Sequence, residues 1–347
     1  MYNVAVIGAT GYVGAEIIRL LQIHPEISVS CVASRSFAGK PYSNIYPNLK
    51  NIFDMPLNDV DIDSLCDQAD FFITALPHDA SKDIIPALIN RGKKVIDHSA
   101  VFRFRKKQTF EEWYGAAHEM DDLLEMSVYG LPEIYRGSIS KAVLVANPGC
   151  YPTCAILGIA PLLANKLVYA TNIIVDAASG ISGAGRKSDL SYSFCETHEN
   201  FKAYGVANHR HTPEIEQELS LLAGEEITIS FTPHLLPIKR GILTTSYLNL
   251  KDNNMTSDKL YEIYSEYYKN EFFVRVLEPG VFPEIKNVAG SNFIDIGVAV
   301  DKRVNRAVVV SALDNLGKGA AGQAIQCLNL MLGLDEKTGL THPAMYL

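Results

Sequence analysis

The sequence predicts an α/β protein of two domains, a parallel-sheet domain followed by an α+β domain with a mixed sheet. Three observations support this prediction. The chain has 347 residues, which exceeds the length of most single domains. Short apolar runs alternate with helical periodicity over the first 150 residues or so. After Cys150 the pattern changes to longer β-rich runs.

The N-terminal part begins with a βαβ unit. NVAVIG (3–8) is a short apolar strand, and from Ala15 the apolar residues recur at helical spacing until His24-Pro25 ends the pattern. ISVSCVAS follows as a second strand, and a crossover of this kind requires a parallel sheet covered by helices. FFITAL, KVIDHS and VLVANP predict further buried strands at 71–76, 94–99 and 143–148, with a helix near 80–90.

The second part carries the runs NIIVDAAS, EITISFTPHLL, GILTTSYLNL and NFIDIGVAV with RAVVVSAL, at 172–179, 226–236, 241–250 and 293–313. One helix interrupts them near 260–268. Long strands with few helices favour a mixed or antiparallel sheet. The run GAAGQAIQCLNLMLGL (319–334) has helical spacing and is expected to pack back on the first domain. We therefore expect domains at 1–149, joined by 316–347, and at 150–315.

Bulk composition narrows the class of function. The net charge is −8, and 48% of residues are hydrophobic and 20% charged, which is ordinary for a globular protein with a small-molecule substrate rather than nucleic acid. The N-terminus lacks the basic region of a signal peptide, and no apolar run approaches the ~20 residues that span a bilayer, so we expect a cytoplasmic protein. Six cysteines without a CxxC pair are typical of reduced thiols.

A glycine-rich turn, GATGYVG (8–14), joins the first strand to the first helix. Gly8, Gly11 and Gly14 have the spacing GxxGxxG, because Thr10 stands where a GxGxxG fingerprint has its second glycine. Glycines let the backbone approach a pyrophosphate, and a helix N-terminus offers free N–H groups. The setting favours a Rossmann-like dinucleotide site over an ordinary strand-helix turn.

The end of the second strand indicates which dinucleotide binds. An NAD site places an Asp or Glu there, about twenty residues after the glycines, to accept from the ribose 2′-hydroxyl. This chain has Ser34, Arg35 and Ser36 instead. A guanidinium with hydroxyls suits the 2′-phosphate of NADP, although Arg35 could also be a solvated surface charge.

Cys150 follows a Pro-Gly turn in NPGCYPT and precedes the apolar run CAILGIA. A cysteine at or near the N-cap of that helix would have its thiolate stabilised by the dipole and free N–H groups, which lower a thiol pKa from ~8.5 to roughly 3.5–7.5. The same N–H groups would stabilise an oxyanion. A buried structural thiol is the alternative for Cys150, and a packed thiol is what we expect of Cys154.

A thiol nucleophile needs a proton shuttle, and NHRHTPEI offers His209 and His211 ahead of a helix start at Thr212-Pro213. In an extended segment the two side chains would point to opposite sides, so that only one would face the thiol. Structural hydrogen bonding is the alternative for either histidine. A zinc site from these histidines and a cysteine lacks further ligands at metal-site spacing.

Two further segments are candidates for binding an anion or a cofactor. SAVFRF places Ser99 and Arg103 just beyond the C-terminal end of a strand, where open α/β sheets bind ligands. SGISGAGR (179–186) is a glycine-rich loop whose backbone could approach a nicotinamide or a substrate. Either could instead be a surface turn.

Seven segments, in this order, resemble the N-acetyl-gamma-glutamyl-phosphate reductase family over essentially the whole chain: GATGYVG, SAVFR, NPGCYPT, SGISGAGR, NHRHTPEI, PHLLPIKRGI and DNLGKGAAGQAIQ. Aspartate-semialdehyde dehydrogenases share the glycine loop, an arginine after the fourth strand and a catalytic cysteine. HRHTPEI and HLLPIKRGI distinguish the two groups. SAVFRF differs slightly from the family's SADFRL, but Ser99 and Arg103 are retained.

The resemblance implies an NADP-dependent enzyme of arginine biosynthesis in which Cys150 is the nucleophile and His211 the acid-base, with His209 as the second choice. Arg103 would hold the acyl phosphate. The implied cofactor contacts are Gly8, Thr10, Gly11, Tyr12, Val13, Gly14, Ser34, Arg35, Ala75, Leu76, Pro77, Ser182, Gly183 and Asn315. The predicted substrate contacts are Ser99, Arg103, Asn147, Ser179, Arg186 and His209.

These residues together predict reduction of an acyl phosphate to an aldehyde through a Cys150 thioester, with NADPH as hydride donor. The same chemistry on N-succinylglutamyl, aminoadipyl or aspartyl phosphate is the nearest alternative. A non-catalytic NADP-binding redox sensor and a zinc-dependent alcohol dehydrogenase are alternatives from other classes. Relatives and the long strands of the second domain suggest a homodimer or homotetramer.

Overall fold

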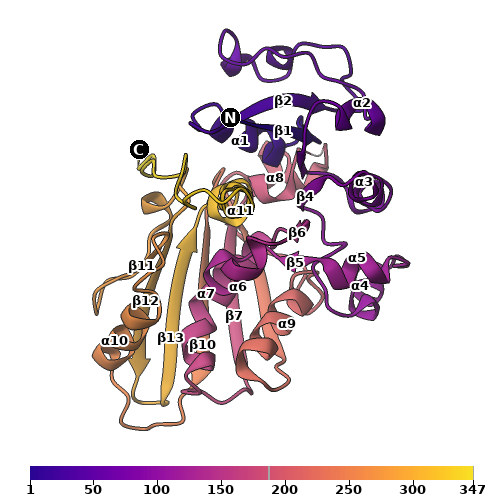
Figure 1. The fold of residues 1–347 in the computed structure, drawn as a ribbon. Coiled ribbons are helices and arrows are strands. Elements are labelled where there is room, and N and C mark those ends of the chain that lie inside the picture. Colours follow the sequence, from indigo (N-terminus) through magenta and orange to yellow (C-terminus); the bar gives the residue numbers. More distant parts are fainter. Residues whose placement is uncertain (187, 347) are drawn as a thin grey trace. The chain divides into compact units, whose positions relative to one another are not determined.

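The structure is a computed structural model that describes residues 1–186 and 188–346, and its internal contacts divide the chain into two compact units (Figure 1). The first unit comprises Met1–Pro148 and Ala320–His342. The second comprises Gly149–Gly319 and the residues from Pro343 onward. The chain therefore passes to the second unit just before Gly149, returns to the first immediately after Gly319, and crosses once more between His342 and Pro343.

The first unit is built on a six-stranded parallel sheet with the strand order β2-β1-β3-β4-β6-β5. Its elements are β1 (Tyr2–Ile7), α1 (Tyr12–Leu21), β2 (Ile27–Ala33), α2 (Ile62–Cys66), β3 (Phe71–Thr74), α3 (His78–Asn90), β4 (Lys94–Asp97), α4 (Lys107–Tyr114), α5 (Asp121–Met126), β5 (Val128–Tyr129), α6 (Pro132–Ile139), β6 (Leu144–Ala146) and α11 (Gly322–Met331).

The parallel sheet forms because its strands are apolar on both faces and are connected by helices. In β1 the four residues Val4–Ile7 are buried, and so is all of β6. Helix α11 comes from the other end of the chain and contacts α1, α6 and β4. The expected α/β sheet is confirmed, and the helix predicted from Ala15 begins three residues earlier, at Tyr12.

The second unit is built on a seven-stranded mixed sheet with the order β11-β12-β13-β10-β7-β9-β8. Its elements are α7 (Cys150–Ala164), β7 (Ile173–Gly180), α8 (Phe194–Thr197), β8 (Lys202–Ala203), α9 (Thr212–Ala223), β9 (Ile229–Leu236), β10 (Ile242–Asn249), α10 (Ser257–Tyr267), β11 (Val274–Val276), β12 (Ile294–Asp301) and β13 (Arg306–Leu313). The β7–β9 and β11–β12 pairs are parallel and the others antiparallel, so the predicted mixed sheet is confirmed.

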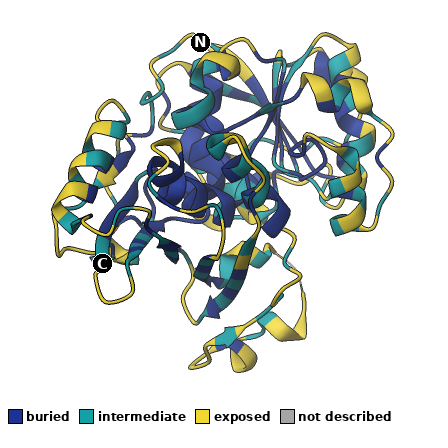
Figure 2. Ribbon diagram, turned by 90° about the horizontal axis from the view of Figure 1, so that it is seen from below, coloured by how far each residue is buried: buried dark blue, intermediate teal, exposed yellow. Residues whose placement is uncertain are grey.

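Helix α7 is the core of the second unit, and its residues from Tyr151 to Leu163 are all buried (Figure 2). It packs on β10 and β13, and α9 and α10 pack beside it. The approach to β13 is close, since a Cβ on Gly158 would collide with the Ser311 hydroxyl. The Tyr264 hydroxyl donates to the Gly158 carbonyl at 2.7 Å. The N-terminus of α7 is therefore held by a fully packed helix.

A short π-helical turn, Gly317–Ala321, precedes α11. The Gly319 N–H donates to the Asp314 carbonyl at 2.9 Å, five residues back, instead of four as in an α-helix. The helix predicted over 319–334 is therefore shorter, and its first turn is wider than the periodicity indicated. Such wide turns often lie at functional sites.

Candidate active site

The glycine loop is packed against the segment that follows β3. Gly8 has φ +83°, and a Cβ there would collide with the carbonyl of Ala75. A Cβ on Gly14 would lie 2.5 Å from the Gly8 carbonyl oxygen. Both positions accept only glycine, because the obstructing atoms are backbone. The structure thus brings together the glycine loop and the predicted cofactor segment Ala75, Leu76 and Pro77.

Helix α1 begins at Tyr12 after the N-cap Gly11, which supplies no side-chain hydrogen bond to the first amides. The first turn, which contains Tyr12, Val13 and Gly14, therefore keeps N–H groups that have no partner within the helix. Two tyrosines that were not predicted from the sequence donate hydrogen bonds to backbone carbonyls of the loop. Tyr42 donates to the Ala9 carbonyl at 2.8 Å and Tyr46 to the Thr10 carbonyl at 3.0 Å.

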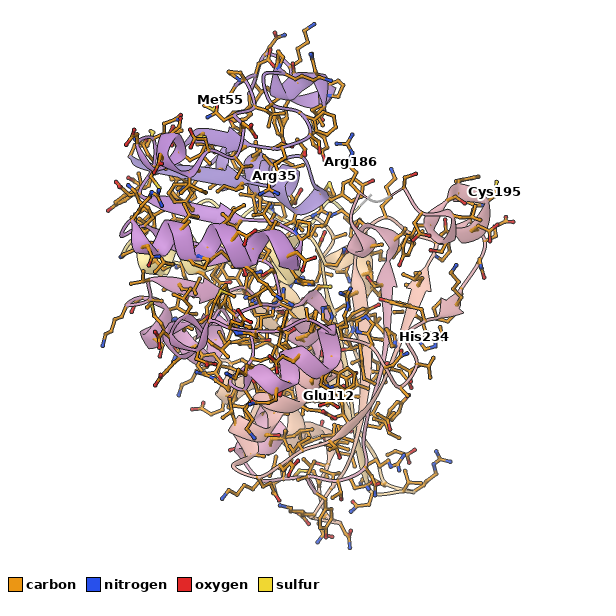
Figure 3. All side chains as sticks on the ribbon, turned by 90° about the vertical axis from the view of Figure 1, so that its right-hand side faces the viewer. Arg35, Met55, Glu112, Arg186, Cys195 and His234 are labelled. Atoms are coloured by element: carbon orange, nitrogen blue, oxygen red, sulfur yellow. The ribbon has the colours of Figure 1, made fainter. Side chains whose placement is uncertain are left out.

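The end of β2 brings a second group of predicted cofactor residues to this loop. The Ser34 and Thr10 hydroxyls are 3.1 Å apart, and Ser34 is buried. Arg35 follows and is exposed (Figure 3). Strand β2 ends at Ala33. None of the next three residues, Ser34, Arg35 and Ser36, has a carboxylate side chain. The loop and the strand end therefore offer N–H groups, hydroxyls and a guanidinium, all of which suit phosphate.

A third group lies after β4 in the same unit. The Ser99 hydroxyl donates to Asp97, whose carboxyl is fully buried and whose pKa is raised by burial. Arg103 is buried, and its Nε donates to the Asn147 carbonyl at 2.8 Å while an Nη donates to the His98 carbonyl at 2.7 Å. The structure thus brings Ser99, Arg103 and Asn147 together. Asp97 and His98 are additional members that the sequence analysis missed.

His98 in this group stays neutral. Burial and the neighbouring Arg103 lower its pKa to about 3. The Asn147 amide donates to His98 Nδ1 at 3.2 Å, which places the imidazole proton on Nε2. The positive charge of this group therefore comes from Arg103.

Cys150 is the first residue of α7, and Gly149 is the N-cap. Gly149 has no side chain to cap the helix, and the first turn carries no acidic residue of its own. Cys150 is half-buried, whereas Cys154 is completely buried and burial raises its pKa to about 12. Cys154 is thus the packed thiol that the sequence predicts, and Cys150 has the position that favours a thiolate.

His211 lies directly against the residue before Cys150. A Cβ on Gly149 would be 2.5 Å from His211 Nε2 and 2.9 Å from two ring carbons. On another side, a Cβ on Gly319 would be 2.8 Å from the Cβ of Cys150. Gly149 therefore leaves space for the His211 imidazole, and Gly319 leaves space for Cys150. Gly319 was missed by the sequence analysis because its partner is 169 positions away in the chain.

The two histidines are on the same side, which corrects the expectation from an extended segment. Residues 209–211 form a turn in which the Thr212 N–H donates to the His209 carbonyl at 2.9 Å, and His211 has helical φ and ψ. The ring centroids of His209 and His211 are 4.9 Å apart. The expectation was wrong because the first turn of α9 starts to wind before its first assigned residue, Thr212.

His209 occupies an aromatic enclosure. Its ring makes edge contacts with Tyr151, Tyr204 and Phe231 at centroid distances of 5.6, 5.4 and 5.4 Å. Its Nδ1 accepts from the His211 N–H at 3.1 Å. Burial, and then the charge of Arg210, lower its pKa to about 4. His209 is therefore neutral near pH 7, and its Nδ1 helps to fix the turn that carries His211.

Glu214 is a buried carboxylate at this site that the sequence analysis did not single out. It lies in the first turn of α9, and its Oε1 accepts from the Gly149 N–H at 2.8 Å. The N-termini of α7 and α9 meet here without a side-chain cap on either N-cap residue. A carboxylate between two positive helix ends is stabilised by both dipoles. The motif TPEI could have indicated this role, because an acidic side chain at the third position of a helix often accepts a hydrogen bond from a backbone N–H at a helix start.

The predicted loop residues form a separate group around Asn315. The Asn315 Nδ2 donates to the Ser182 hydroxyl at 2.9 Å, and its Oδ1 accepts from the Gly241 N–H at 2.7 Å. Gly183 lies beside the Ser179 hydroxyl. Ser179, Ser182, Gly183 and Asn315 are thus brought together. Arg186 is exposed further along the loop (Figure 3).

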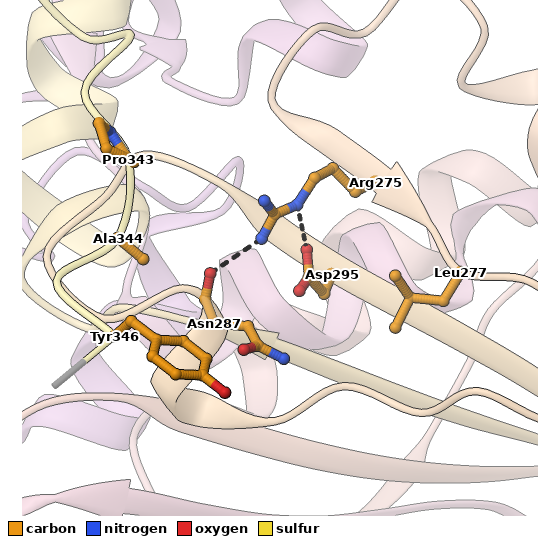
Figure 4. Close-up of a pocket in the computed structure, with 7 residues that line it drawn as sticks. All are labelled: Arg275, Leu277, Asn287, Asp295, Pro343, Ala344 and Tyr346. Atoms are coloured by element: carbon orange, nitrogen blue, oxygen red, sulfur yellow. Dashed lines mark hydrogen bonds and ion pairs between the residues drawn. The ribbon is translucent and has the colours of Figure 1, made fainter.

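Other possible sites carry none of the predicted residues. Within residues 1–186 and 188–346, no three His, Cys, Asp or Glu side chains are grouped to hold a metal ion. A pocket of about 430 Å³ in the second unit is lined by the Arg275–Asp295 ion pair and by Pro343, Ala344 and Tyr346, among others (Figure 4). Asp295 is buried and bonded by Arg275, so the pocket offers no unpaired acid. No helix in the described part of the chain is long and apolar enough to cross a membrane.

Comparison with known families gives matches to both units. Residues 3–142 match the model described as "Semialdehyde dehydrogenase, NAD binding domain". Residues 150–315 match the model described as "Semialdehyde dehydrogenase, dimerisation domain". Together these matches cover most of the chain.

Curated relatives match over the full length. An N-acetyl-gamma-glutamyl-phosphate reductase of Acetivibrio thermocellus is 61% identical over 100% of both chains. Proteins with the same name from Desulforudis audaxviator and Geobacter sulfurreducens are each 51% identical, over 100% and 98% of both chains.

Solved structures of aspartate semialdehyde dehydrogenases share the fold. The Vibrio cholerae enzyme II complexed with ASA has a TM-score of 0.73 at 17% identity, covering 96% of this chain and 98% of that one. The Candida albicans enzyme with NADP has a TM-score of 0.69 at 17% identity and the same coverage. These likenesses concern the fold alone. On the family models and the full-length relatives, the chain belongs to the semialdehyde dehydrogenase family and, within it, to the N-acetyl-gamma-glutamyl-phosphate reductases.

Proposed function

We propose that this chain reduces N-acetyl-gamma-glutamyl phosphate to N-acetylglutamate 5-semialdehyde and phosphate, with NADPH as the reductant, in arginine biosynthesis. The observation that carries the proposal is the half-buried Cys150 at the N-terminus of α7, with the His211 ring packed on the preceding Gly149. This is the arrangement of a nucleophile and an acid-base required for acyl transfer. The full-length relatives of the same name support the substrate.

The first unit fits NADP. The glycine loop allows backbone approach, and the uncapped start of α1 supplies N–H groups for a pyrophosphate. Ser34 and Arg35 suit the 2′-phosphate, and the absence of a carboxylate at the end of β2 removes the usual partner of the NAD 2′-hydroxyl. In the second unit, Asn315 holds Ser182 in place, and with Gly183 these residues are proposed nicotinamide contacts.

The proposed chemistry starts at the thiol. The Cys150 thiolate attacks the γ-acyl carbon, the amides at the start of α7 stabilise the oxyanion, and phosphate leaves to give a thioester. NADPH, when bound, supplies a hydride. The reduced thioester is a thiohemiacetal oxyanion; as its C=O bond re-forms, the C–S bond breaks and His211 donates a proton to the departing sulfur, so that the semialdehyde leaves with Cys150 regenerated. Arg103 is the proposed partner of the phosphate, because a buried guanidinium fixed by two backbone carbonyls is preorganised.

His211 rather than His209 is the proposed acid-base. The pKa of His209 is lowered to about 4, far below the operating range of a general base at neutral pH. Its Nδ1 is occupied by the His211 N–H, and aromatic rings surround it. His209 is therefore assigned to fixing the His211 turn and to shaping the substrate side of the site, with Ser99, Asn147, Ser179 and Arg186 as further proposed substrate contacts.

The two units have different proposed roles. We assign binding of the NADP phosphates to the first unit, and the nicotinamide contacts and the thiol chemistry to the second. We also propose that a homodimer forms through the face of the second unit's sheet opposite α7. Thr244 faces α7, since its hydroxyl is 3.5 Å from the Cys154 sulfur, so its neighbours in β10 face the other way. That open face carries half-buried apolar residues, namely Ile174, Leu243, Tyr247, Val308 and Val310. A cytoplasmic location remains the prediction made from the sequence.

The test is to run the reaction backwards. NADP reduction is followed with N-acetylglutamate semialdehyde, with and without inorganic phosphate, and with aspartate semialdehyde as the competing substrate. We expect reduction only with phosphate and preference for the N-acetyl compound. The Cys150→Ser variant should lose several orders of magnitude in turnover while binding NADPH normally, and Cys195→Ser, an exposed cysteine, serves as the matched control.

Each other outcome has a definite meaning. Reduction without phosphate would show hydrolysis of the thioester by water, hence an ordinary aldehyde dehydrogenase. Turnover with aspartate semialdehyde, or with an N-succinyl substrate only, would move the substrate assignment within the same chemistry. NADPH binding without turnover of any acyl phosphate would favour a redox sensor, and metal-dependent turnover would require a different reading of Cys150 and the histidines.

A further inference from the structure

The sequence motif HLLPIKRGI has no role in the proposed mechanism, yet its last residues lie beside the candidate site within the second unit. Residues 238–241 form the turn between β9 and β10, the β9–β10 turn. In the sheet, β10 lies between β7 and β13 (Figure 1). Ile242, at the start of β10, pairs with Ser179 near the end of β7 and with Leu313 at the end of β13. The topology therefore brings the turn beside the segments that follow these two strands.

The β9–β10 turn holds two of the proposed nicotinamide contacts. The Ser182 N–H donates to the Lys239 carbonyl at 3.1 Å. The Gly241 N–H donates to Asn315 Oδ1 at 2.7 Å, and Asn315 Nδ2 donates to the Ser182 hydroxyl at 2.9 Å. Because the oxygen and the nitrogen of the Asn315 amide both have partners, the orientation of this side chain is fixed. The turn thus fixes Ser182 directly and Asn315 through its amide.

Arg240, in the same turn, forms a bidentate ion pair with Asp314. Its Nε and an Nη donate to the two carboxylate oxygens at 2.8 and 3.1 Å, and the Gly290 N–H donates to the same carboxylate. Asp314 is fully buried. A guanidinium fork fixes both the position and the orientation of a carboxylate, which an ammonium group cannot do. Stability alone does not account for the pair, because apolar residues often replace a buried ion pair without loss of stability.

The oriented carboxylate of Asp314 caps the π-helical turn that contacts the nucleophile. Asp314 Oδ1 accepts from the Leu316 and Gly317 N–H groups at 2.8 and 2.9 Å. The backbone carbonyl of Asp314 accepts from the Gly319 N–H at 2.9 Å. Gly319 is the residue whose added Cβ would lie 2.8 Å from the Cβ of Cys150. A single turn of backbone therefore connects the ion pair to the nucleophile.

We propose that Arg240 is a positioning residue of this active site. Its turn fixes the nicotinamide contacts Ser182 and Asn315, and its ion pair with Asp314 fixes the π-helical turn against Cys150. Hydride transfer requires the nicotinamide and the thioester carbon to be held at reacting distance, and a displacement of about 1 Å can cost a hundredfold in rate. The inference rests on the proposed function and adds the side chain that holds both reacting groups in register.

The experiment exchanges a guanidinium for an ammonium group in two ion pairs of the second unit. Arg240→Lys keeps the positive charge beside Asp314 and loses the fork. Arg275→Lys makes the same change at Asp295, a buried carboxylate that also accepts from an arginine Nε, and it is the matched control. Both variants retain the charge of the pair and should fold, which circular dichroism and thermal unfolding verify. Asp314→Asn disrupts the Arg240 pair from its other side.

Two readouts follow the two groups that the ion pair positions. Stopped-flow absorbance measures single-turnover hydride transfer from N-acetylglutamate semialdehyde to NADP. Mass spectrometry of the Cys150 peptide measures the rate of its alkylation by iodoacetamide. We expect Arg240→Lys and Asp314→Asn to slow hydride transfer about tenfold or more. The dissociation constant of NADPH should stay within about threefold of wild type, because the proposed contacts of the NADP phosphates are unchanged.

Alkylation of Cys150 should become about threefold faster or more in Arg240→Lys and Asp314→Asn, because a looser π-helical turn leaves the thiol more accessible. Arg275→Lys should keep the wild-type value of each rate. Wild-type values of both rates in Arg240→Lys and Asp314→Asn overturn the proposal, and so does an equal loss in Arg275→Lys. Because alkylation requires no substrate, failure of the reductase assignment would remove the hydride readout and leave this one intact.

Discussion

The substitution Gly149→Ala tests the assignment of His211 by changing one methyl group. Gly149 has φ −67° and ψ 151°, values that alanine adopts without strain, and its N–H would still donate to Glu214. Loss of glycine at an N-cap costs only a modest amount of helix stability. The effect of the substitution is therefore mainly steric, at the face of the imidazole.

The size of the effect follows from the packing. The new methyl carbon would be 2.5 Å from His211 Nε2, whereas an ordinary contact begins at about 3.4 Å, so the ring must retreat by roughly 1 Å. The rings of Tyr151 and His209 also contact the imidazole, with centroids 5.9 and 4.9 Å away, and limit how it can move. A displacement of about 1 Å of a reacting group costs on the order of a hundredfold in rate.

The assay is steady-state kinetics in both directions, with thermal unfolding and NADPH binding as separate readouts. We expect kcat about a hundredfold lower, with the NADPH dissociation constant unchanged, because neither Gly149 nor His211 is among the proposed cofactor contacts. Gly137→Ala is the control: it is also a helical-region glycine, and nothing lies within 4 Å of its added Cβ. A Gly149→Ala enzyme whose kcat stays within threefold of wild type would refute the placement of the acid-base at His211.

Three further results are expected. Arg35→Ala should raise KM for NADPH tenfold or more and leave KM for NADH nearly unchanged, as parallel titrations with the two cofactors would show; equal effects would remove Arg35 from the 2′-phosphate site. Gly319→Ala should displace Cys150, because the new carbon would lie 2.8 Å from its Cβ, and so lower kcat and alter the rate of thiol alkylation; unchanged values of both would contradict the contact. The pKa of His209 is lowered from 6.5 to about 4, so the unfolded chain takes up its proton first, and the free energy of unfolding should decrease as pH falls from about 6.5 to 4. His209→Phe should reduce that slope in denaturant titrations at several pH values, with the remainder due to His98, whose pKa is lowered to about 3; an unchanged slope would exclude a contribution from His209.

Much of the fold was predictable from the sequence because its strongest patterns are local. The buried strands of the first unit were identified within about two residues, since apolar runs between turn residues have few other interpretations. Short elements were not predicted. β5 and β8 have two residues each, which is too few for any periodicity, and they exist because a neighbouring strand supplies their hydrogen bonds.

The candidate site likewise has residues that local sequence patterns predicted and contacts between distant residues that they did not. Cys150 at the start of α7 followed from a Pro-Gly turn and an apolar run, which are local signals. The packing of Gly319 on Cys150, the bond from Gly149 to Glu214 and the grouping of Asn315 with Ser182 join residues far apart in the chain, and spacing carries no information on them. The prediction for the histidine pair failed for a local reason, because a turn that begins before the helix places on one side two rings that were expected on opposite sides.

The positions at which the chain passes between units have a practical consequence for building chimeras. Of the chain's three crossings, one is at Pro148–Gly149, one at Gly319–Ala320, inside the π turn, and one at His342–Pro343. A designer who wishes to exchange the nucleotide-binding unit for that of a relative must therefore make two of the three splices within two residues of Cys150 or of the glycine that contacts it. Exchanges that shift either splice alter the nucleophile's surroundings, so the modularity suggested by two compact units does not extend to interchangeable parts.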